Sequence, residues 1–232
     1  MKKASLILCL AIAAFLTLPQ NVHSQSTTAQ STITKIADAD DLFILSLTSD
    51  NWSGLPAAIE AKPFRSRGFS FLLMKEKANE SGKLAFGYGL GFSSQNVHTD
   101  GALVYDDSSN TSSFYKLPDS LDVSLNKLSL NYIDAAIEFR LRTAEDSHER
   151  RFKVSLGFKA GVLVQSHTKY EDKNGKVKTY DIKNLNTFQF GPTFRIGYGG
   201  FALTGYYSLA TVFKKSKGPE MNPYSVGISV TF

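Results

Sequence analysis

The chain has 232 residues, which allows one or two domains, with 42% hydrophobic residues and a mean hydropathy of −0.15. Its single cysteine, Cys9, lies in an apolar run, which excludes disulfides within the chain, cysteine catalysis and cysteine-based zinc sites. A net charge of +5 and a pI near 9.1 raise nucleic acid and anionic lipid as partners, and the positions of the charges decide between them.

The first 24 residues have the layout of a secretory signal peptide. Lys2 and Lys3 precede the apolar run 4–18, and Val22 and Ser24 are small residues before a cut at Gln25. The run is short for a membrane-spanning helix, which needs ~20 apolar residues. We predict a signal peptide at 1–24, a flexible Ser/Thr/Gln-rich periplasmic leader at 25–40 and one domain at 41–232. Cleavage lowers the net charge from +5 to +3.

From residue 41 onward, apolar residues alternate with small or polar ones, the pattern typical of β-strands. Eight segments show it, at 41–51, 68–75, 84–93, 133–142, 152–165, 187–198, 201–213 and 224–232. The pattern is weakest in 41–51, 68–75 and 201–213. Most of the segments are long enough for a tilted membrane-spanning strand, which takes ~9–11 residues. Pro192 falls inside a strand and predicts a bulge or a local distortion.

The connecting segments alternate between short and long. The short ones are 76–82, 143–150 and 199–200, and the long ones are roughly 52–66, 99–126, 168–186 and 214–222. Outer-membrane barrels have short periplasmic turns and longer external loops. We therefore predict an all-β fold, an eight-stranded antiparallel up-and-down transmembrane β-barrel with both termini in the periplasm.

A membrane barrel and a soluble barrel differ in which face of their strands, the apolar or the polar one, points outward. The less apolar face of 84–93 reads Ala-Gly-Gly-Gly-Ser, a poor surface toward water but a suitable one for a crowded interior. The apolar face carries too many Phe and Tyr to fit inside eight strands. We expect this face to contact lipid, with interface anchors at Trp52, Tyr170, Tyr198, Tyr224 and Phe232. The alternative is a soluble secreted ligand-binding barrel, which stays in the soluble fraction without detergent.

Short motifs occur in a fixed order along the C-terminal half. They are 132–138 (YIDAAIE), 153–157 (KVSLG), 166–170 (SHTKY), 190–192 (FGP), 218–220 (GPE) and the terminal Phe232. On these motifs the chain resembles the PorT-like outer-membrane β-barrel family over most of 41–232, most strongly from 127 onward. The resemblance implies a small eight-stranded barrel whose last strand is read by the outer-membrane assembly machinery, with the signal at Tyr224, Val226, Ile228, Val230 and Phe232. PorT itself resembles part of a protein-secretion and gliding apparatus, but a shared fold does not transfer that role.

Seven charged residues on three consecutive strands share the inward parity. They are Asp134, Glu138, Arg140, Arg142, Lys153, Lys159 and Arg195. Unpaired buried charge is costly, so we predict a salt-bridge network that plugs the lumen. This set sums to +3, the entire charge of the cleaved chain, so the basicity does not point to nucleic acid. An anion-selective conduit is the alternative, although eight strands leave room for little more than side chains.

Two histidines, His98 and His167, fall near the external ends of strands that flank one common neighbour, with Ser94, Asp100 and Glu171 nearby. They are candidates for a metal site or for a lipid-modifying enzyme at the external rim. No HExxH or GxSxG pattern supports either activity. We expect no enzymatic activity, no metal and no cofactor.

The long loops carry opposite charges. Segment 99–126 holds Asp100, Asp106, Asp107, Asp119 and Asp122 against Lys116, whereas 168–186 and 214–222 are each +2. These charges belong to solvated loops or, in the sharper hypothesis, the basic loops contact lipid phosphates and the acidic loop binds a cation or a partner. We therefore expect a non-enzymatic outer-membrane protein. Its partners are outer-membrane lipid, the assembly machinery and an unidentified secretion-complex or surface partner.

Overall fold

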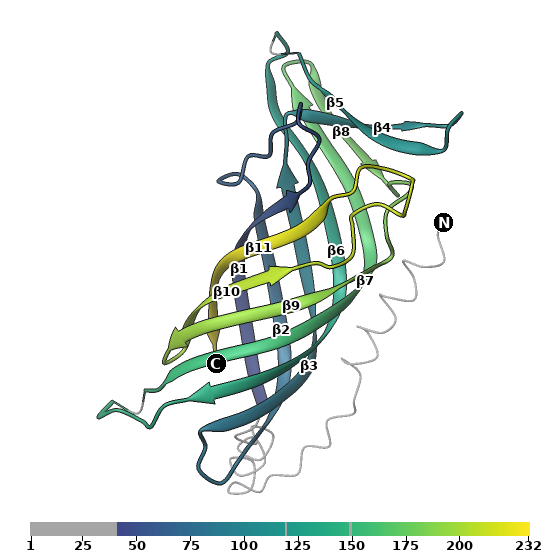
Figure 1. The fold of residues 1–232 in the computed structure, drawn as a ribbon. Helices are drawn as coiled ribbons and strands as arrows, with labels where there is room; N and C mark the ends of the chain where they lie inside the picture. The colour runs from purple at the N-terminus through teal and green to yellow at the C-terminus, as the bar shows by residue number, and fades with distance from the viewer. Residues whose placement is uncertain (1–40, 119, 149) are drawn as a thin grey trace, which may run out of the picture. The chain divides into compact units, whose positions relative to one another are not determined.

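A computed structural model describes residues 41–118, 120–148 and 150–232, and every regular element in these ranges is a β-strand (Figure 1). The predicted signal peptide at 1–24 and the leader at 25–40 lie outside the described residues. Within the described ranges, no helix has the length and apolar character needed to cross a membrane.

Eight long strands form a closed antiparallel ring. They are β1 (Asp41–Ser53), β2 (Arg67–Ala78), β3 (Leu84–His98), β6 (Val123–Arg142), β7 (Phe152–Asp172), β9 (Phe188–Tyr198), β10 (Phe201–Tyr207) and β11 (Asn222–Thr231). Sequential strands pair, and β1 pairs with β11 to close the ring, with Leu47 opposite Ile228. The predicted eight-stranded antiparallel barrel is therefore confirmed, and each strand overlaps one of the predicted segments.

Three short strands lie within segments that we predicted as loops. β4 (Gly101–Asp106) and β5 (Thr111–Lys116) form a separate hairpin, and β8 (Gly175–Tyr180) folds back onto the end of β7. β6 and β7 continue beyond the predicted segments as strands of 20 and 21 residues. The predicted strand 201–213, in contrast, ends at Tyr207.

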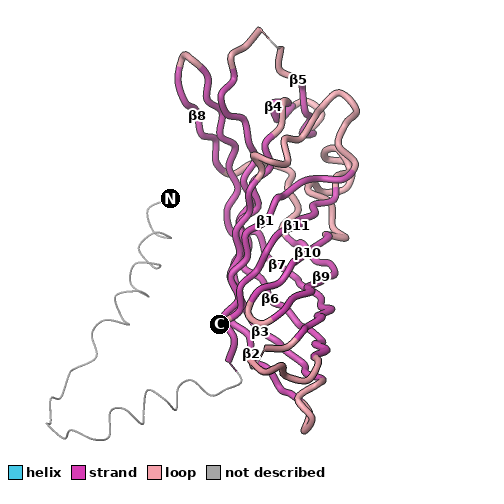
Figure 2. The backbone as a smooth tube through the Cα atoms, turned by 90° about the vertical axis from the view of Figure 1, so that its left-hand side faces the viewer, coloured by secondary structure: helices cyan, strands magenta, loops and turns pink. Residues whose placement is uncertain are grey.

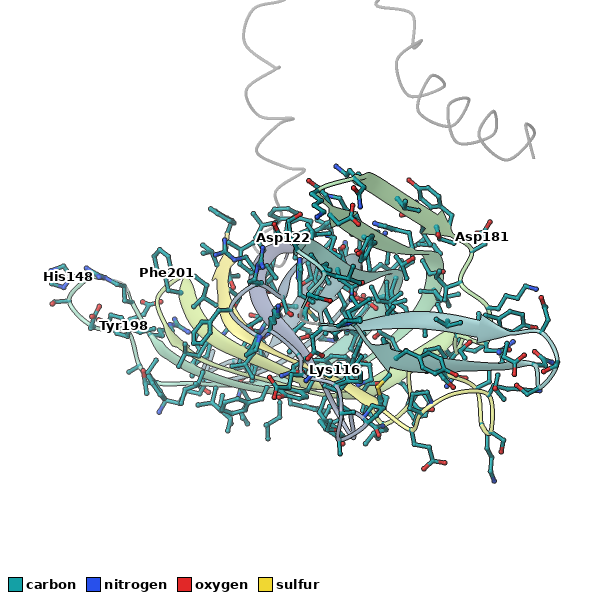
Figure 3. The ribbon with its side chains drawn as sticks, turned by 90° about the horizontal axis from the view of Figure 1, so that it is seen from above. Lys116, Asp122, His148, Asp181, Tyr198 and Phe201 are labelled. Carbon is teal, nitrogen blue, oxygen red and sulfur yellow. The ribbon has the colours of Figure 1, made fainter. Side chains whose placement is uncertain are left out.

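The two ends of the barrel differ. At one end, called the turn end, short connections join β2 to β3, β6 to β7 and β9 to β10, and β11 terminates there. At the other, called the loop end, β4, β5 and β8 project beyond the barrel wall (Figures 1 and 2). Viewed from above, His148, Tyr198 and Phe201 lie together at the turn end, far from Asp181 at the loop end (Figure 3).

Side chains alternate strictly between the two faces of the barrel wall. On β6, Ile133, Ile137 and Phe139 are exposed outward, whereas Asp134 and Glu138 are buried inward. The same alternation on the other strands produces an apolar outer belt. Its members include Leu47, Phe69, Leu73, Phe86, Leu90, Leu156, Phe158, Val162, Phe188, Phe194, Phe201, Leu203, Val226 and Ile228. An exposed apolar surface that surrounds the molecule is typical of lipid contact and not of a soluble barrel.

The glycine-rich face of β3 points into the barrel, as the sequence predicts. A Cβ atom on Gly89 would lie 2.0 Å from the backbone oxygen of Leu73, and one on Gly91 would lie 2.1 Å from that of Phe71. Any larger residue would push β3 away from β2. Glycine thus permits the close approach of these two strands.

The bulge expected at Pro192 does not occur between β7 and β9, whose register runs unbroken with Pro192 opposite Phe158. The ladder between β9 and β10 instead ends at the Tyr206–Thr193 pair, next to the proline. Because proline has no N–H to donate, pairing stops there. After Tyr207 the chain leaves the barrel wall.

Two of the five predicted interface anchors are wrong. Trp52 is only 3% exposed and packs inside the barrel against Phe114, at a ring distance of 5.9 Å, because it has the inward parity of β1. Tyr170 faces inward because a bulge at Val164 reverses the parity of β7 above that point. Tyr198 and Phe232 are exposed on the outer face at the turn end, and Tyr224 is half-buried on the outer face.

Candidate functional site

The inward residues of β6 define the layers of the barrel interior. From the turn end these residues are charged (Arg142, Arg140, Glu138), then small (Ala136), then charged again (Asp134), and finally hydrophobic (Tyr132, Leu130, Leu128). The interior therefore contains a polar part toward the turn end and an apolar part at the mouth of the loop end.

Two carboxylates and three arginines form the ion-paired group nearest the turn end. Glu138, 3% exposed, accepts a hydrogen bond from Arg140 Nη2 at 2.9 Å and another from Arg195 Nη2. Glu76 on β2 pairs with Arg140 and with Arg142. Each carboxylate thus bridges two guanidinium groups on the wall of the barrel through charge-assisted hydrogen bonds.

A second group lies one layer closer to the loop end. Asp134, 1% exposed, is 3.2 Å from Lys159 Nζ and accepts a hydrogen bond from Gln189 at 3.2 Å. Lys159 Nζ also lies 4.2 Å from the centre of the Tyr206 ring. The ammonium is therefore held by a carboxylate and by an aromatic face, both inside the barrel.

Six of the seven predicted lumen residues take part in these ion pairs. Lys153 is the exception, because the described residues include no ion pair to it and its direct cross-strand neighbour is Arg142. It lines a cavity of about 50 Å³ at the turn end together with Arg142 and Arg195. A second polar cavity, of about 60 Å³, lies beside Lys159 and Asp50. Each has room for only a few water molecules.

Two interior carboxylates were missed from the sequence. Glu76 falls in a segment that we predicted as a turn, but β2 continues to Ala78 and gives Glu76 the same parity as the buried Met74. Asp50, 2% exposed, accepts hydrogen bonds from Ser225 Oγ at 2.7 Å and from the Asn96 N–H at 2.9 Å. Adding these two anions lowers the charge of the interior set from +3 to +1.

The mouth of the barrel is filled by hydrophobic side chains from the wall and from the loops. Trp52, Val97, Leu128, Leu130 and Tyr132 come from strands, and Leu185, Val212, Phe213 and Met221 come from the loop-end connections. Phe213 is 1% exposed and Met221 is fully buried. We call these nine residues the mouth core. Backbone hydrogen bonds from Val212 to Met221 and from Asn186 to Val212 hold the loops in place.

The two rim histidines lie on the outer wall and do not meet. His98 is directly opposite Lys127, whereas His167 is opposite Ser129, one row nearer the turn end. β6 separates them, so two strand spacings of ~4.8 Å and the offset of one row place their Cα atoms about 12 Å apart. No group of three or more His, Cys, Asp or Glu residues suited to a metal ion occurs in the described part of the chain.

Lysines surround both histidines. Burial and the charges of Lys127, Arg65, Lys169 and Lys62 lower the pKa of His98 to about 4. Burial and the charges of Lys178, Lys127 and Lys169 lower the pKa of His167. Both imidazoles are therefore neutral at pH 7.

The acidic segment 99–126 spreads its carboxylates over the β4–β5 hairpin. Asp100 lies 3.4 Å from Lys116, and Asp107 lies 3.8 Å from Lys183. Hydrogen bonds from Ser108 and Ser109 lower the pKa of Asp106, which closes the turn of the hairpin. Asp122 is exposed, and Asp119 lies outside the described residues. Asp100, Asp106 and Asp107 therefore interact with other residues of the loop end.

A closed eight-stranded barrel with an apolar outer belt and a polar interior defines an integral membrane β-barrel protein. The chain belongs to the family described as outer membrane protein beta-barrel domain, whose family model matches residues 48–214. The matched stretch starts in β1 and ends after β10. Membership places the barrel in the outer membrane. No curated protein matches the chain.

Proposed function

We propose that this protein is a non-enzymatic outer-membrane barrel whose lumen does not conduct and whose loop end binds lipid or a surface partner. The observation that carries the proposal is the mouth core, which lies across the loop end above a charged interior. Phe213, Met221 and Leu185 reach it from two separate loops. A channel for ions or small polar solutes would require a hydrated path through this apolar layer.

The interior charges support the same proposal. Glu138, Arg140, Arg195, Asp134 and Lys159 are each less than 10% exposed and each has an ionic partner. Charges that line an ion path face water, whereas these face one another. The arrangement fits a plug that joins the walls of the barrel.

The finer identity of the protein is also part of the proposal. We infer that it is PorT-like and that the assembly machinery reads its last strand. Val226, Ile228 and Phe232 support this inference, since they are exposed on the outer face of β11, with Tyr224 and Val230 half-buried on the same face. A signal peptide at 1–24 would deliver the chain to that machinery. The loop-end partner would then belong to a secretion complex or to the cell surface.

Planar-bilayer recording of the refolded barrel tests the closed lumen. We expect no discrete current steps in the natural protein. Removing the central ring of the mouth core with Phe213→Ala, together with the loop residue Met221→Ala, is expected to produce irregular conductance. Phe64→Ala is the matched control, because Phe64 is 93% exposed on a loop. Reproducible channels in the unmodified protein would contradict the proposal.

The absence of enzymatic activity has its own test. Cells that carry His98→Ala or His167→Ala are expected to keep the same lipid A profile as cells with the natural protein. A change in acyl chains or phosphates that follows either substitution would replace this proposal with a lipid-modifying enzyme at the rim.

A further inference from the structure

Three lysines and a histidine stand side by side on the outer wall at the loop end. The β-sheet register pairs His98 with Lys127, Lys127 with Lys169, and Lys169 with Lys178. Directly opposed residues in antiparallel strands point to the same face. Lys127, Lys169 and Lys178, here called the lysine row, therefore extend across β6, β7 and β8 on the outer face. Like charges in such positions destabilise a sheet unless an anion joins them.

The lysine row lies directly above the apolar belt on the same strands. Phe92, Ile133 and Val162 form one continuous row of the belt. Six residues separate Ile133 from Lys127, about 20 Å along the strand and about 15 Å in height at the usual tilt. Ser94, Asn131 and Gln165 lie in the next row above that belt row, and Asn131 donates to Gln165 at 2.6 Å. This order, apolar then neutral polar then cationic, matches the change from acyl chains to head group in a lipid leaflet.

The charges in the lysine row are poorly compensated within the described residues. Glu171 is the one carboxylate paired with this face, and it lies 3.8 Å from both Lys169 and Lys176. Lys127 Nζ binds the neutral Asn96 side chain at 2.8 Å, and Lys178 Nζ lies 5.9 Å from the Tyr180 ring centre. Lys62 and Arg65 add further positive charge beside His98. Among the residues that the structure describes, Glu171 is thus the one carboxylate with an ion pair to the row, and Asp100 lines the same pocket as Lys62 and Arg65.

The electrostatics of the lysine row favour an anion on this face. Burial and the neighbouring lysines lower the pKa of Lys127, and close contact with Lys176 followed by burial lowers that of Lys169. An anion on this face would relieve the repulsion between these lysines.

We propose that the lysine row, with His98 and His167 beside it, binds the phosphorylated head group of a glycolipid in the outer leaflet. The belt beneath the row gives the acyl chains of the same molecule a place to pack, which a free phosphate ion would not use. The row is wide enough for a two-sugar head group, because its three strands lie ~4.8 Å apart and the long lysine side chains extend the reach of the row. This inference deepens the proposed function by assigning a lipid to one face of the loop end.

Binding of hexa-acylated, bis-phosphorylated lipid A to the purified barrel in neutral detergent tests the site. Native mass spectrometry or a fluorescence titration at low and high salt gives the affinity. The triple variant K127Q/K169Q/K178Q is expected to weaken binding at least tenfold, since it removes three surface cations that attract an anionic head group. The control K214Q/K215Q/K217Q removes the same charge from another loop-end segment and is expected to change the affinity less than twofold.

Further variants and ligands separate the remaining outcomes. K127R/K169R/K178R keeps the charge and should retain binding, while heat-modifiable migration on gels shows that each variant is folded. Dephosphorylated lipid A should bind at least tenfold more weakly than the phosphorylated form. Equal binding of the two lipids, or equal losses in both glutamine triples, would overturn the proposal. Competition by millimolar inorganic phosphate as strong as that by lipid A would also overturn it. None of these results would alter the prediction that the lumen is closed.

Discussion

Ion pairs line the interior nearest the turn end, whereas hydrophobic side chains meet at the mouth. Glu138 and Asp134 are held by cations on neighbouring strands, so each pair joins parts of the wall. Phe213 and Met221 come from loops and pack on the wall without charge. The difference shows that strands supply the ion-paired part, whereas the mouth core combines five residues from strands with four from loops. Loss of a loop side chain should therefore open the mouth while the ion-paired part stays intact.

The largest loss of stability is expected from the mouth core. Phe213→Ala removes a ring that is 1% exposed and in edge contact with Phe114 at a centroid distance of 6.3 Å. Truncating a buried phenylalanine leaves a cavity and costs about 3–5 kcal/mol. Urea unfolding of the refolded barrel in detergent micelles measures the loss. Phe64→Ala should change the free energy of unfolding by less than about 0.5 kcal/mol. An equal loss at both sites would contradict the prediction that a loop residue in the mouth core stabilises the barrel more than an exposed loop residue does.

The ion-paired part is expected to respond next. Glu138→Gln keeps the shape of the side chain but leaves Arg140 and Arg195 without their shared carboxylate. Breaking a buried pair from one side costs about 3 kcal/mol, because the remaining charge is uncompensated. The control Glu145→Gln breaks the half-exposed pair with Arg151 and should cost no more than about 1 kcal/mol. A small effect at Glu138 would mean that water or Glu76 already compensates both arginines.

Strand periodicity predicted which residues form the barrel wall, but it did not predict the mouth core. Period-2 alternation placed Asp134, Glu138 and Arg140 inside because side chains of a strand alternate between faces. It failed for Tyr170, since the bulge at Val164 reverses the parity and nothing in the sequence marks it. Glu76 was missed because strand ends are the least certain boundaries.

The mouth core was missed for a different reason. Leu185, Phe213 and Met221 lie in irregular loops, where no periodicity links a residue to a face. Trp52 shares this core, although an aromatic near a strand end is also typical of the membrane interface. Only its even position in β1, shared with the buried Ile44 and Asp50, would have indicated the interior. Residues in irregular loops have no such alternation from which a face could be inferred.

A smaller effect is expected where the polar part is tightly packed. A Cβ on Gly161 would lie 2.2 Å from Asp134 Oδ1, so Gly161→Ala must displace the carboxylate that holds Lys159. We expect a loss of about 1–3 kcal/mol in urea unfolding. Gly205→Ala is the matched control, because the nearest atom to its added Cβ is 4.0 Å away. Comparable losses at both glycines would show that strand flexibility, and not the space around Asp134, sets the cost.

The smallest effect concerns the rim, which belongs to neither part of the interior. The pKa of His98 is lowered to about 4, so the unfolded chain binds a proton that the folded chain does not between pH 6.5 and pH 4. Stability is therefore fully present above pH 6.5 and falls as the pH drops through this window. Because His98 is partly exposed, solvent screening limits its share to about 1 kcal/mol or less. His98→Gln should flatten this part of the pH profile, measured by urea unfolding in micelles free of anionic lipid.

Added phosphorylated lipid A should reduce the slope in the natural protein, because an anion beside the imidazole favours its charged form. An unchanged slope in His98→Gln would assign the pH dependence to other groups.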